Sequence, residues 1–135
     1  MNMKRFAAAC VVTAGLTFGA SAVAQTSAPA AAPQGNITVV TIIDVLSNAN
    51  VPQNVENSNA LLNKLVADSE HMPGAVSIKV LREGARSNHF IIFAVWKDMK
   101  SFEDYRAAES TRGFRQALQP RLGGPFDERL YVDLK

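Results

Sequence analysis

The chain has 135 residues but only one cysteine, Cys10, and two histidines, His71 and His89. Cys10 lies in an N-terminal segment that we expect to be removed, so the remaining chain has no thiol for a disulfide or for a thiolate nucleophile. No set of histidines and carboxylates has the spacing of a metal-ligand motif. The sequence therefore predicts neither a disulfide nor a metal site.

The sequence also lacks an excess of charge of either sign. Lys4 and Arg5 are two of its 14 basic residues, and all 12 acidic residues follow them. Once that N-terminal segment is removed, basic and acidic side chains balance, and nothing resembles the electrostatic footprint of a nucleic-acid-binding protein. We therefore expect no nucleic-acid partner.

A hydrophobic run long enough to span a bilayer is missing as well. Residues 6–20 are apolar and small, follow Lys4 and Arg5, and precede the small-x-small site Ala22-Val23-Ala24. This run of about 15 residues is shorter than the roughly 20 that a spanning helix needs, and the whole pattern is typical of a secretory signal. We expect a signal peptide over residues 1–24, a periplasmic or secreted protein, and no stable membrane insertion after cleavage; a retained anchor is the alternative.

Composition then divides the rest of the chain in two. Residues 25–35 are rich in alanine and proline and carry no charge, so they predict a flexible or extended linker. Residues 36–135 have the length of one domain. Their patterns predict strands over residues 36–46, 75–82, 89–96 and 126–134 and helices over residues 50–71 and 99–118. This order is the α+β, ferredoxin-like βαββαβ arrangement.

Three local details of these elements can be tested. Asn50 is predicted to cap the first helix, with Pro52 in its first turn. In the strand of residues 75–82, Val76, Ile78 and Val80 are predicted to share one face. The second helical segment is predicted to be interrupted near residues 110–113.

The strand of residues 89–96, HFIIFAVW, has one polar member and predicts a strand that is covered on both faces. The helices of one short chain can supply only one layer of cover. We therefore expect a second copy of the protein to cover the other face, as a homodimer.

Four segments of the domain resemble a known family. They are residues 72–75 (MPGA), the strand that ends in Trp96, residues 102–114, and residues 126–131 (FDERLY). Together they are similar to the antibiotic biosynthesis monooxygenase (ABM) domain family, in particular to its quinol monooxygenase-like members within the dimeric α/β-barrel superfamily.

The resemblance implies a homodimer whose two sheets face one another, with an apolar pocket in each subunit between sheet and helices. It also implies oxidation of a small aromatic or quinol by dioxygen with no metal, flavin or other cofactor. This chemistry needs little from the protein, because a deprotonated phenol can give an electron to dioxygen if the site binds the anion and excludes water.

The chain departs from relatives at three positions. Ala94 stands where many relatives carry glutamate, and Tyr105 where many carry histidine. Leu118 stands where a haem-degrading branch carries its histidine, so we do not expect haem cleavage.

Seven residues are candidates for the site. His89 and Tyr105 are the predicted catalytic residues, since imidazole titrates in a useful range and a phenol can orient or deprotonate a substrate. The predicted substrate-binding residues are Trp96, Asn88, Phe102, Phe114 and Arg112. Arg112 and Arg115 are also candidates for a pocket entrance that attracts an anion.

Each candidate also has a structural interpretation. Trp96 can be a core aromatic whose N–H meets a backbone carbonyl, Tyr105 can pack on the sheet with its hydroxyl at the surface, and His89 can be solvated. Asn88 can cap a turn, and Arg112 can pair with Glu109 on a solvated face. For residues 127–129 we expect ion pairs between subunits.

The sequence therefore predicts an exported, cofactor-independent monooxygenase that oxidises a small aromatic or quinol. The alternative is a non-catalytic periplasmic dimer of the same fold that binds a small ligand or serves in a stress response.

Overall fold

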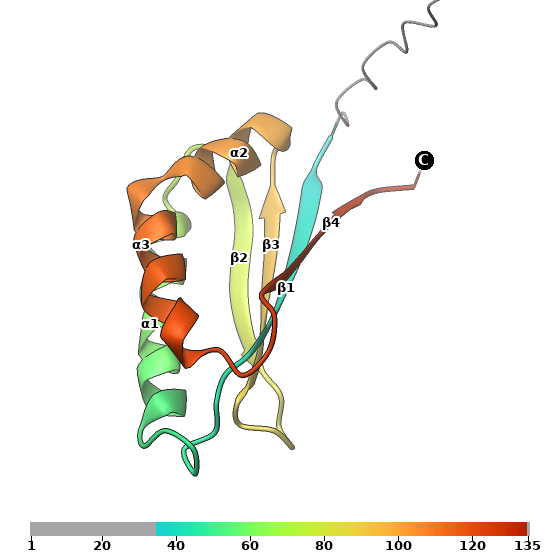
Figure 1. Ribbon diagram of the computed structural model, residues 1–135. Coiled ribbons are helices and arrows are strands. Elements are labelled where there is room, and N and C mark those ends of the chain that lie inside the picture. The colour runs from blue at the N-terminus through green and yellow to red at the C-terminus, as the bar shows by residue number, and fades with distance from the viewer. Residues whose placement is uncertain (1–34, 135) are drawn as a thin grey trace, which may run out of the picture. The chain divides into compact units, whose positions relative to one another are not determined.

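The computed structural model describes residues 35–134, which form a four-stranded antiparallel sheet with helices packed on one face (Figure 1). The predicted signal peptide and almost all of the predicted linker lie outside the described residues. Within residues 35–134, no helix combines the length and apolar character needed to cross a membrane.

The strands pair in the order β2-β3-β1-β4, and every pairing is antiparallel. The elements in chain order are β1 (Ile37–Asp44), α1 (Asn54–Ser69), β2 (Ala75–Arg82), β3 (His89–Trp96), α2 (Met99–Ala107), α3 (Glu109–Leu118), the 3₁₀ helix η1 (Gln119–Arg121) and β4 (Asp127–Val132). The ferredoxin-like βαββαβ prediction is confirmed, with α2 and α3 together forming the second crossover.

The core lies between the sheet and the helices. Alternate residues of each strand point to one face, so β3 buries Phe90, Ile92, Ala94 and Trp96 against the helices. In β1 the buried apolar residues on this face are Ile37, Val39 and Ile43. The inner residues of the helices complete the core; they are Val55, Leu62, Leu65, Phe102, Tyr105, Phe114 and Leu118.

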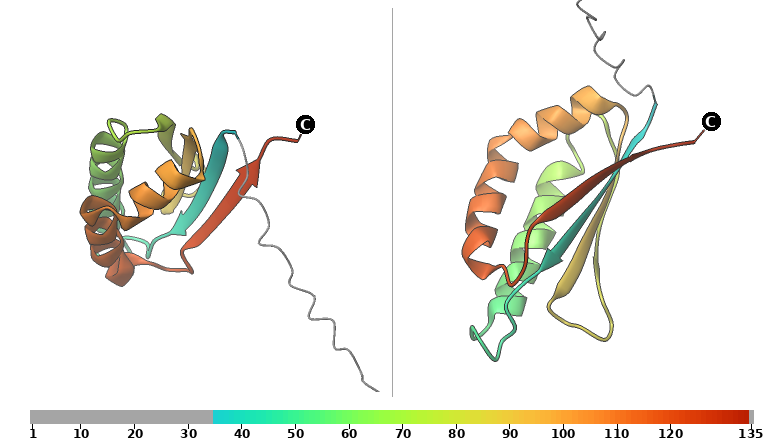
Figure 2. Two further views of the ribbon diagram at one scale, coloured as in Figure 1. Left: turned by 90° about the horizontal axis from the view of Figure 1, so that it is seen from above. Right: turned by 45° about the vertical axis from the view of Figure 1, so that its right-hand side comes forward.

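No helix of the described chain covers the opposite face of the sheet (Figure 2). Its central strands nevertheless present apolar side chains there: Val40, Ile42, Ile91, Phe93 and Val95. Phe93 is 38% exposed, and Leu81 and Tyr131 at the flanks are about half exposed. In the single chain, β3 is therefore buried on one face only.

The predicted cap of α1 is wrong. The helix begins at Asn54 rather than at residue 51, because residues 50–53 form turns and Gln53 adopts a left-handed conformation with φ of 59°. The side chain of Asn48, not that of Asn50, accepts a hydrogen bond from the backbone N–H of Val55 at 2.9 Å.

The predicted alternation of side chains in β2 fails at the start of the strand. A register shift between Ala75 and Ser77 leaves Val76 57% exposed, whereas Ile78 and Val80 pack against the core. A bulge of this kind adds one residue to the strand. The alternation of inward and outward side chains is therefore shifted by one position after the bulge relative to the residues before it.

The predicted interruption of the second helical segment is present, but it lies at Ala108, two residues before the predicted residues 110–113. Ala108 has φ of −58° and ψ of 143°, and its N–H donates to the carbonyls of Asp104 and Tyr105. Gly113 lies inside α3. The extended ψ of Ala108 turns the chain, and α3 then buries Thr111, Phe114 and Leu118.

Candidate functional site

An aromatic cluster fills the interior where β3 ends and α2 begins. The ring centroids of Trp96 and Tyr105 are 4.8 Å apart, and those of Phe102 and Tyr105 are 6.2 Å apart. The Asp98 carboxylate accepts the backbone N–H of Ser101 at 2.8 Å and caps α2 two residues after the strand. Helical spacing then turns Phe102 and Tyr105 inward onto Trp96.

Buried hydrogen-bond donors without an acceptor surround this cluster. Trp96 and Thr111 are fully buried, yet Nε1 of Trp96 and Oγ1 of Thr111 have no partner among the described residues. Nε of Arg115 is buried without a partner as well. Trp96 is therefore a core aromatic, but its N–H does not meet a backbone carbonyl. Buried donors without an acceptor are rare and costly in folded proteins.

Burial raises the pKa of Tyr105 to about 12. The positive charge of Arg115 and the nearby hydroxyl of Thr111 lower this pKa, whereas the negative charge of Glu128 raises it. The phenol is thus protonated at neutral pH and can donate a hydrogen bond, but it cannot serve as a general base there. The same influences place Thr111, Arg115 and Glu128 near the Tyr105 hydroxyl.

Glu128 of β4 joins the two short helices to the sheet. Its carboxylate lies 2.7 Å from Nη2 of Arg115 and 3.5 Å from Nε of Arg106. Arg129 pairs with its neighbour Asp127 at 2.7 Å. These charged groups, expected to pair between subunits, are therefore already paired within one chain.

His89 lies on the other face of the sheet. Residues 89 and 96 of one strand point to opposite faces, and Trp96 points to the helices. Nδ1 of His89 is 2.6 Å from Oδ1 of Asp44, and Nε2 is 3.9 Å from Oε2 of Glu83. With its side chain 13% exposed, His89 is neither fully solvated nor close to Tyr105.

Asn88 has a structural role in the described chain. Its Nδ2 donates to the carbonyl of Val45 at 2.9 Å, and its own carbonyl accepts the N–H of Val45 at 2.9 Å. These two hydrogen bonds extend the pairing of β1 and β3 beyond the end of β1. Asn88 therefore does not reach the aromatic cluster.

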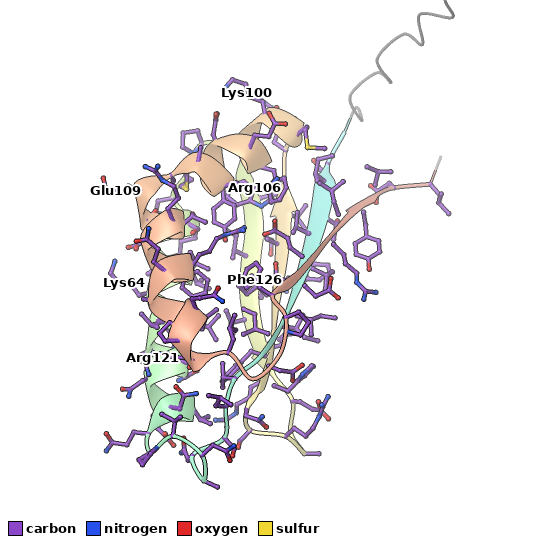
Figure 3. All side chains as sticks on the ribbon, viewed as in Figure 1. Lys64, Lys100, Arg106, Glu109, Arg121 and Phe126 are labelled. Atoms are coloured by element: carbon purple, nitrogen blue, oxygen red, sulfur yellow. The ribbon has the colours of Figure 1, made fainter. Side chains whose placement is uncertain are left out.

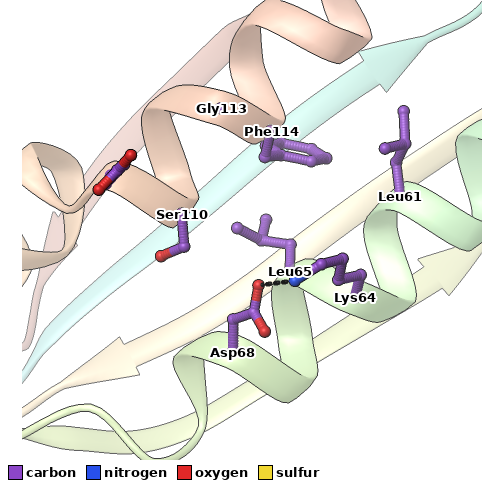
Figure 4. Close-up of a pocket in the computed structure, with 8 residues that line it drawn as sticks. Leu61, Lys64, Leu65, Asp68, Ser110, Gly113 and Phe114 are labelled. Carbon is purple, nitrogen blue, oxygen red and sulfur yellow. Dashed lines mark hydrogen bonds and ion pairs between the residues drawn. The ribbon is translucent and has the colours of Figure 1, made fainter.

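Phe114 belongs both to the core and to a groove between α1 and α3 (Figure 4). The groove encloses about 540 Å³, and its apolar members are Leu61, Leu65 and Phe114. Lys64 and Asp68, which form an ion pair at 2.6 Å, line it together with Glu109, Ser110 and Gly113. It lies between the helices rather than between helices and sheet.

Arg112 lies in a different concavity, of about 430 Å³, that is also lined by Glu103, Arg106, Ala107 and Arg115. Its side chain is on the exposed side of α3. The structure thus brings Trp96, Tyr105 and Phe102 together and leaves His89, Asn88 and Arg112 outside that cluster. Among residues 35–134, no group of three or more histidine or carboxylate side chains is arranged to hold a metal ion.

Three members of the cluster were missed as site residues. Thr111 is spaced three and seven residues before Phe114 and Leu118, which is a helical signal for a shared face. Arg115 was expected on a solvated face or at a pocket entrance, and Glu128 in an ion pair between subunits, so neither was expected beside Tyr105. Their approach to Tyr105 depends on the register of β4 against β1, for which the sequence has no local signal.

The fold and this interior site define a ferredoxin-like α+β protein with an aromatic, donor-rich centre under its helices. The family described as Antibiotic biosynthesis monooxygenase (ABM) matches residues 52–117. The chain belongs to the ABM domain family. No curated protein matches the chain significantly in sequence.

Solved structures with the same fold include members of this group. SnoaB, a cofactor-independent oxygenase from Streptomyces nogalater solved as a mutant, gives a TM-score of 0.63 at 20% identity, covering 75% of this chain and 95% of that chain. PA3566 from Pseudomonas aeruginosa gives 0.66 at 19% identity, covering 76% and 97%. A conserved protein from Methanosarcina mazei Go1 gives 0.65 at 18% identity, covering 73% and 92%. Proteins of the ABM fold typically form dimers.

Proposed function

We propose that this protein is an exported, cofactor-independent monooxygenase that oxidises a small aromatic or quinol with dioxygen. The observation that carries the proposal is the set of buried, unpartnered donors beside the stacked rings of Trp96 and Tyr105. Membership of the ABM family and the fold shared with a cofactor-independent oxygenase support it.

The donors suit the anion of a phenol. The indole N–H of Trp96 and the hydroxyls of Tyr105 and Thr111 would donate to the phenolate oxygen, and burial would strengthen each hydrogen bond. Since the pKa of Tyr105 is about 12, this residue remains a donor throughout the neutral range. The aromatic rings would pack against the ring of the substrate.

The reaction balances without a cofactor. A benzene-1,4-diol and dioxygen give a hydroxybenzoquinone and water: one oxygen atom forms a new C–O bond in place of a ring C–H, and the other leaves as water. The substrate supplies all four electrons that reduce dioxygen. The protein has only to bind the substrate as its anion, orient it and exclude bulk water.

We also propose that the working form is a homodimer. The uncovered sheet face carries Ile42, Ile91, Phe93 and Val95, and a second copy would bury this apolar surface. His89 and its partner Asp44 lie at one end of the same face, so we assign them to the dimer contact rather than to acid–base catalysis. Export follows from the sequence pattern of residues 1–24.

Oxygen uptake with a panel of hydroquinones and metal-free protein tests the activity. Trp96→Phe and Tyr105→Phe each remove one donor and keep a ring, and we expect each to lower the rate roughly a hundredfold. Tyr131→Phe, at the second tyrosine on the opposite face of the sheet from the cluster, is the matched control and should leave the rate unchanged at equal dimer content. Wild-type protein that consumes no oxygen above background would end the proposal.

A non-catalytic ligand-binding dimer is the second candidate. Two observations favour it: Ala94 leaves the sheet without a carboxylate beside Trp96, and the protonated Tyr105 cannot replace that base. A hydroquinone that shifts the emission of Trp96, the only tryptophan, without any oxygen uptake would establish this alternative.

A further inference from the structure

Three arginines converge where α2 meets α3, on the side of the helix layer that faces β4. Arg106, Arg112 and Arg115 line the concavity of about 430 Å³ together with Glu103 and Ala107. We propose that this concavity binds the oxyanion head of a ligand whose apolar body lies on β4. The ligand class is an aromatic carboxylate or a related amphiphilic oxyanion.

Two of the three guanidinium groups contact a carboxylate and an aromatic ring before any ligand binds. Glu128 pairs with Arg115 at 2.7 Å and with Arg106 at 3.5 Å. Arg115 also lies over the ring of Phe126 at 4.8 Å, and Arg106 over the ring of Phe102 at 5.6 Å. Figure 3 shows Arg106 and Phe126 on the side of β4. Such fixed guanidinium groups lose little freedom when an oxyanion binds.

The charges of the concavity favour an anion. Three guanidinium groups face two carboxylates, Glu103 in the lining and Glu128 at the β4 side. Arg112 has no ion-pair partner within residues 35–134, and Glu109, its predicted partner, points away from the sheet (Figure 3). Nε of Arg115 is a further buried donor without an acceptor. An oxyanion would satisfy both groups with charge-assisted hydrogen bonds.

An apolar shelf continues from this concavity along β4. Glu128, Leu130 and Val132 are alternate residues, so they share the face of β4 that is turned to the helices. Leu130 is 39% and Val132 48% exposed, although both stand on the core side of the sheet. Val132 of β4 lies opposite Ile37 of β1, and Ile37 lies opposite Trp96 of β3, so the three residues form one row across the sheet. A ligand held by the arginines can thus lay its apolar body along the shelf toward Trp96.

The oxyanion site does not depend on oxidation chemistry. The oxyanion site narrows the substrate class of the proposed monooxygenase to phenols that carry a carboxylate, and only this statement rests on the proposed function. Binding and oxygen uptake are measured separately, so absence of uptake would remove the monooxygenase and leave the binding constants standing.

Calorimetric titration of the full chain with salicylate tests the site, with salicylamide as the neutral control of the same shape. We expect salicylate to bind roughly tenfold tighter than salicylamide at low ionic strength, and added salt to reduce the difference. Arg112→Gln should weaken salicylate binding roughly fivefold or more, with salicylamide unaffected. Arg112 is exposed and unpaired within the described residues, so this variant should fold.

Arg82→Gln, at the far end of β2, removes the same charge from an exposed position and should change the affinity less than about twofold. Leu130→Ser should weaken salicylate but not inorganic sulfate, which cannot use the shelf. If sulfate binds as tightly as salicylate and Leu130→Ser does not change the affinity for salicylate, the site binds free inorganic oxyanions and the proposed ligand class is overturned. Equal binding of salicylate and salicylamide, or equal effects of the two arginine variants, would overturn the site.

Discussion

His89 and Trp96, the first and last residues of β3, point to opposite faces of the sheet. Trp96 packs on Tyr105 under the helices, whereas His89 bonds to Asp44 on the uncovered face at 2.6 Å. An imidazole on one side of a sheet cannot take a proton from a phenol on the other. The best base by chemistry is therefore excluded from the aromatic cluster of its own chain by strand geometry alone.

We accordingly predict that His89→Gln changes the rate of oxygen uptake with a hydroquinone less than about twofold, while Tyr105→Phe lowers it roughly a hundredfold. The two variants should be compared at saturating substrate and at equal dimer content. If His89→Gln lowers the rate as much as Tyr105→Phe does, the prediction is contradicted, and the imidazole would have to act in the site of the partner subunit.

The buried phenol of Tyr105 should make stability fall at alkaline pH. Its pKa is about 12 in the folded chain and about 10 in the unfolded chain, so between these values the unfolded state releases a proton that the folded state keeps. Stability from this group is therefore complete below pH 10 and is lost as the pH rises from 10 to 12, by about 2 to 3 kcal/mol.

Urea unfolding between pH 8 and pH 11.5 measures this effect. Tyr105→Phe should flatten the alkaline part of the curve, and Tyr131→Phe, at an exposed position, should not. A wild-type curve that stays level above pH 10 would show that the phenol ionises as readily when folded as when unfolded.

Patterns along the chain predicted what depends on local periodicity. The run of residues 89–96 predicted β3, and the spacing of Phe102, Tyr105, Phe114 and Leu118 predicted which side chains enter the core. Because side chains alternate between the two faces of a strand, residues 89 and 96 must point to opposite faces, although His89 and Trp96 were both predicted to lie at one site. This separation was available from the sequence.

Features that depend on contacts between distant segments were not predictable. The bulge after Ala75 and the left-handed Gln53 have no residue signature, since neither alanine nor glutamine favours these conformations. Glu128 reaches Arg115 only because β4 pairs with β1 in one register. The break at Ala108 was missed because Gly113 is the more usual breaker, and glycine is tolerated within a helix that packs well.

The side chain of Asn54 is predicted to stabilise the connection between β1 and α1. Its fully buried amide donates to the carbonyls of Leu46 at 2.8 Å and Arg121 at 3.0 Å, and so joins the end of β1, the start of α1 and η1. Asn54→Ala leaves both carbonyls without this donor, and we expect it to cost about 2 to 3 kcal/mol of unfolding free energy. The exposed Asn57→Ala on the same helix should cost less than about 0.5 kcal/mol. Equal denaturant midpoints for the two variants would contradict this role.

The uncovered sheet face leads to a prediction about assembly. Phe93 stands at the middle of this face, between Val40 of β1 and Lys79 of β2, and is 38% exposed in the single chain. A glutamate at this position keeps its charge in water in the monomer, but in a dimer it would be buried without a partner. Phe93→Glu should therefore convert a dimer to a monomer in sedimentation or light-scattering measurements.

The folded monomer itself should tolerate the change, because the Phe93 side chain contributes nothing to the core under the helices. We expect Phe93→Glu to keep the circular dichroism of the wild type and to melt at a temperature that no longer depends on protein concentration, since a dimer is stabilised by mass action and a monomer is not. Ala60→Glu, on the exposed side of α1, is the matched control and should remain dimeric. Wild-type protein that sediments as a monomer at every concentration would leave the apolar face to a different partner and would refute the proposed homodimer.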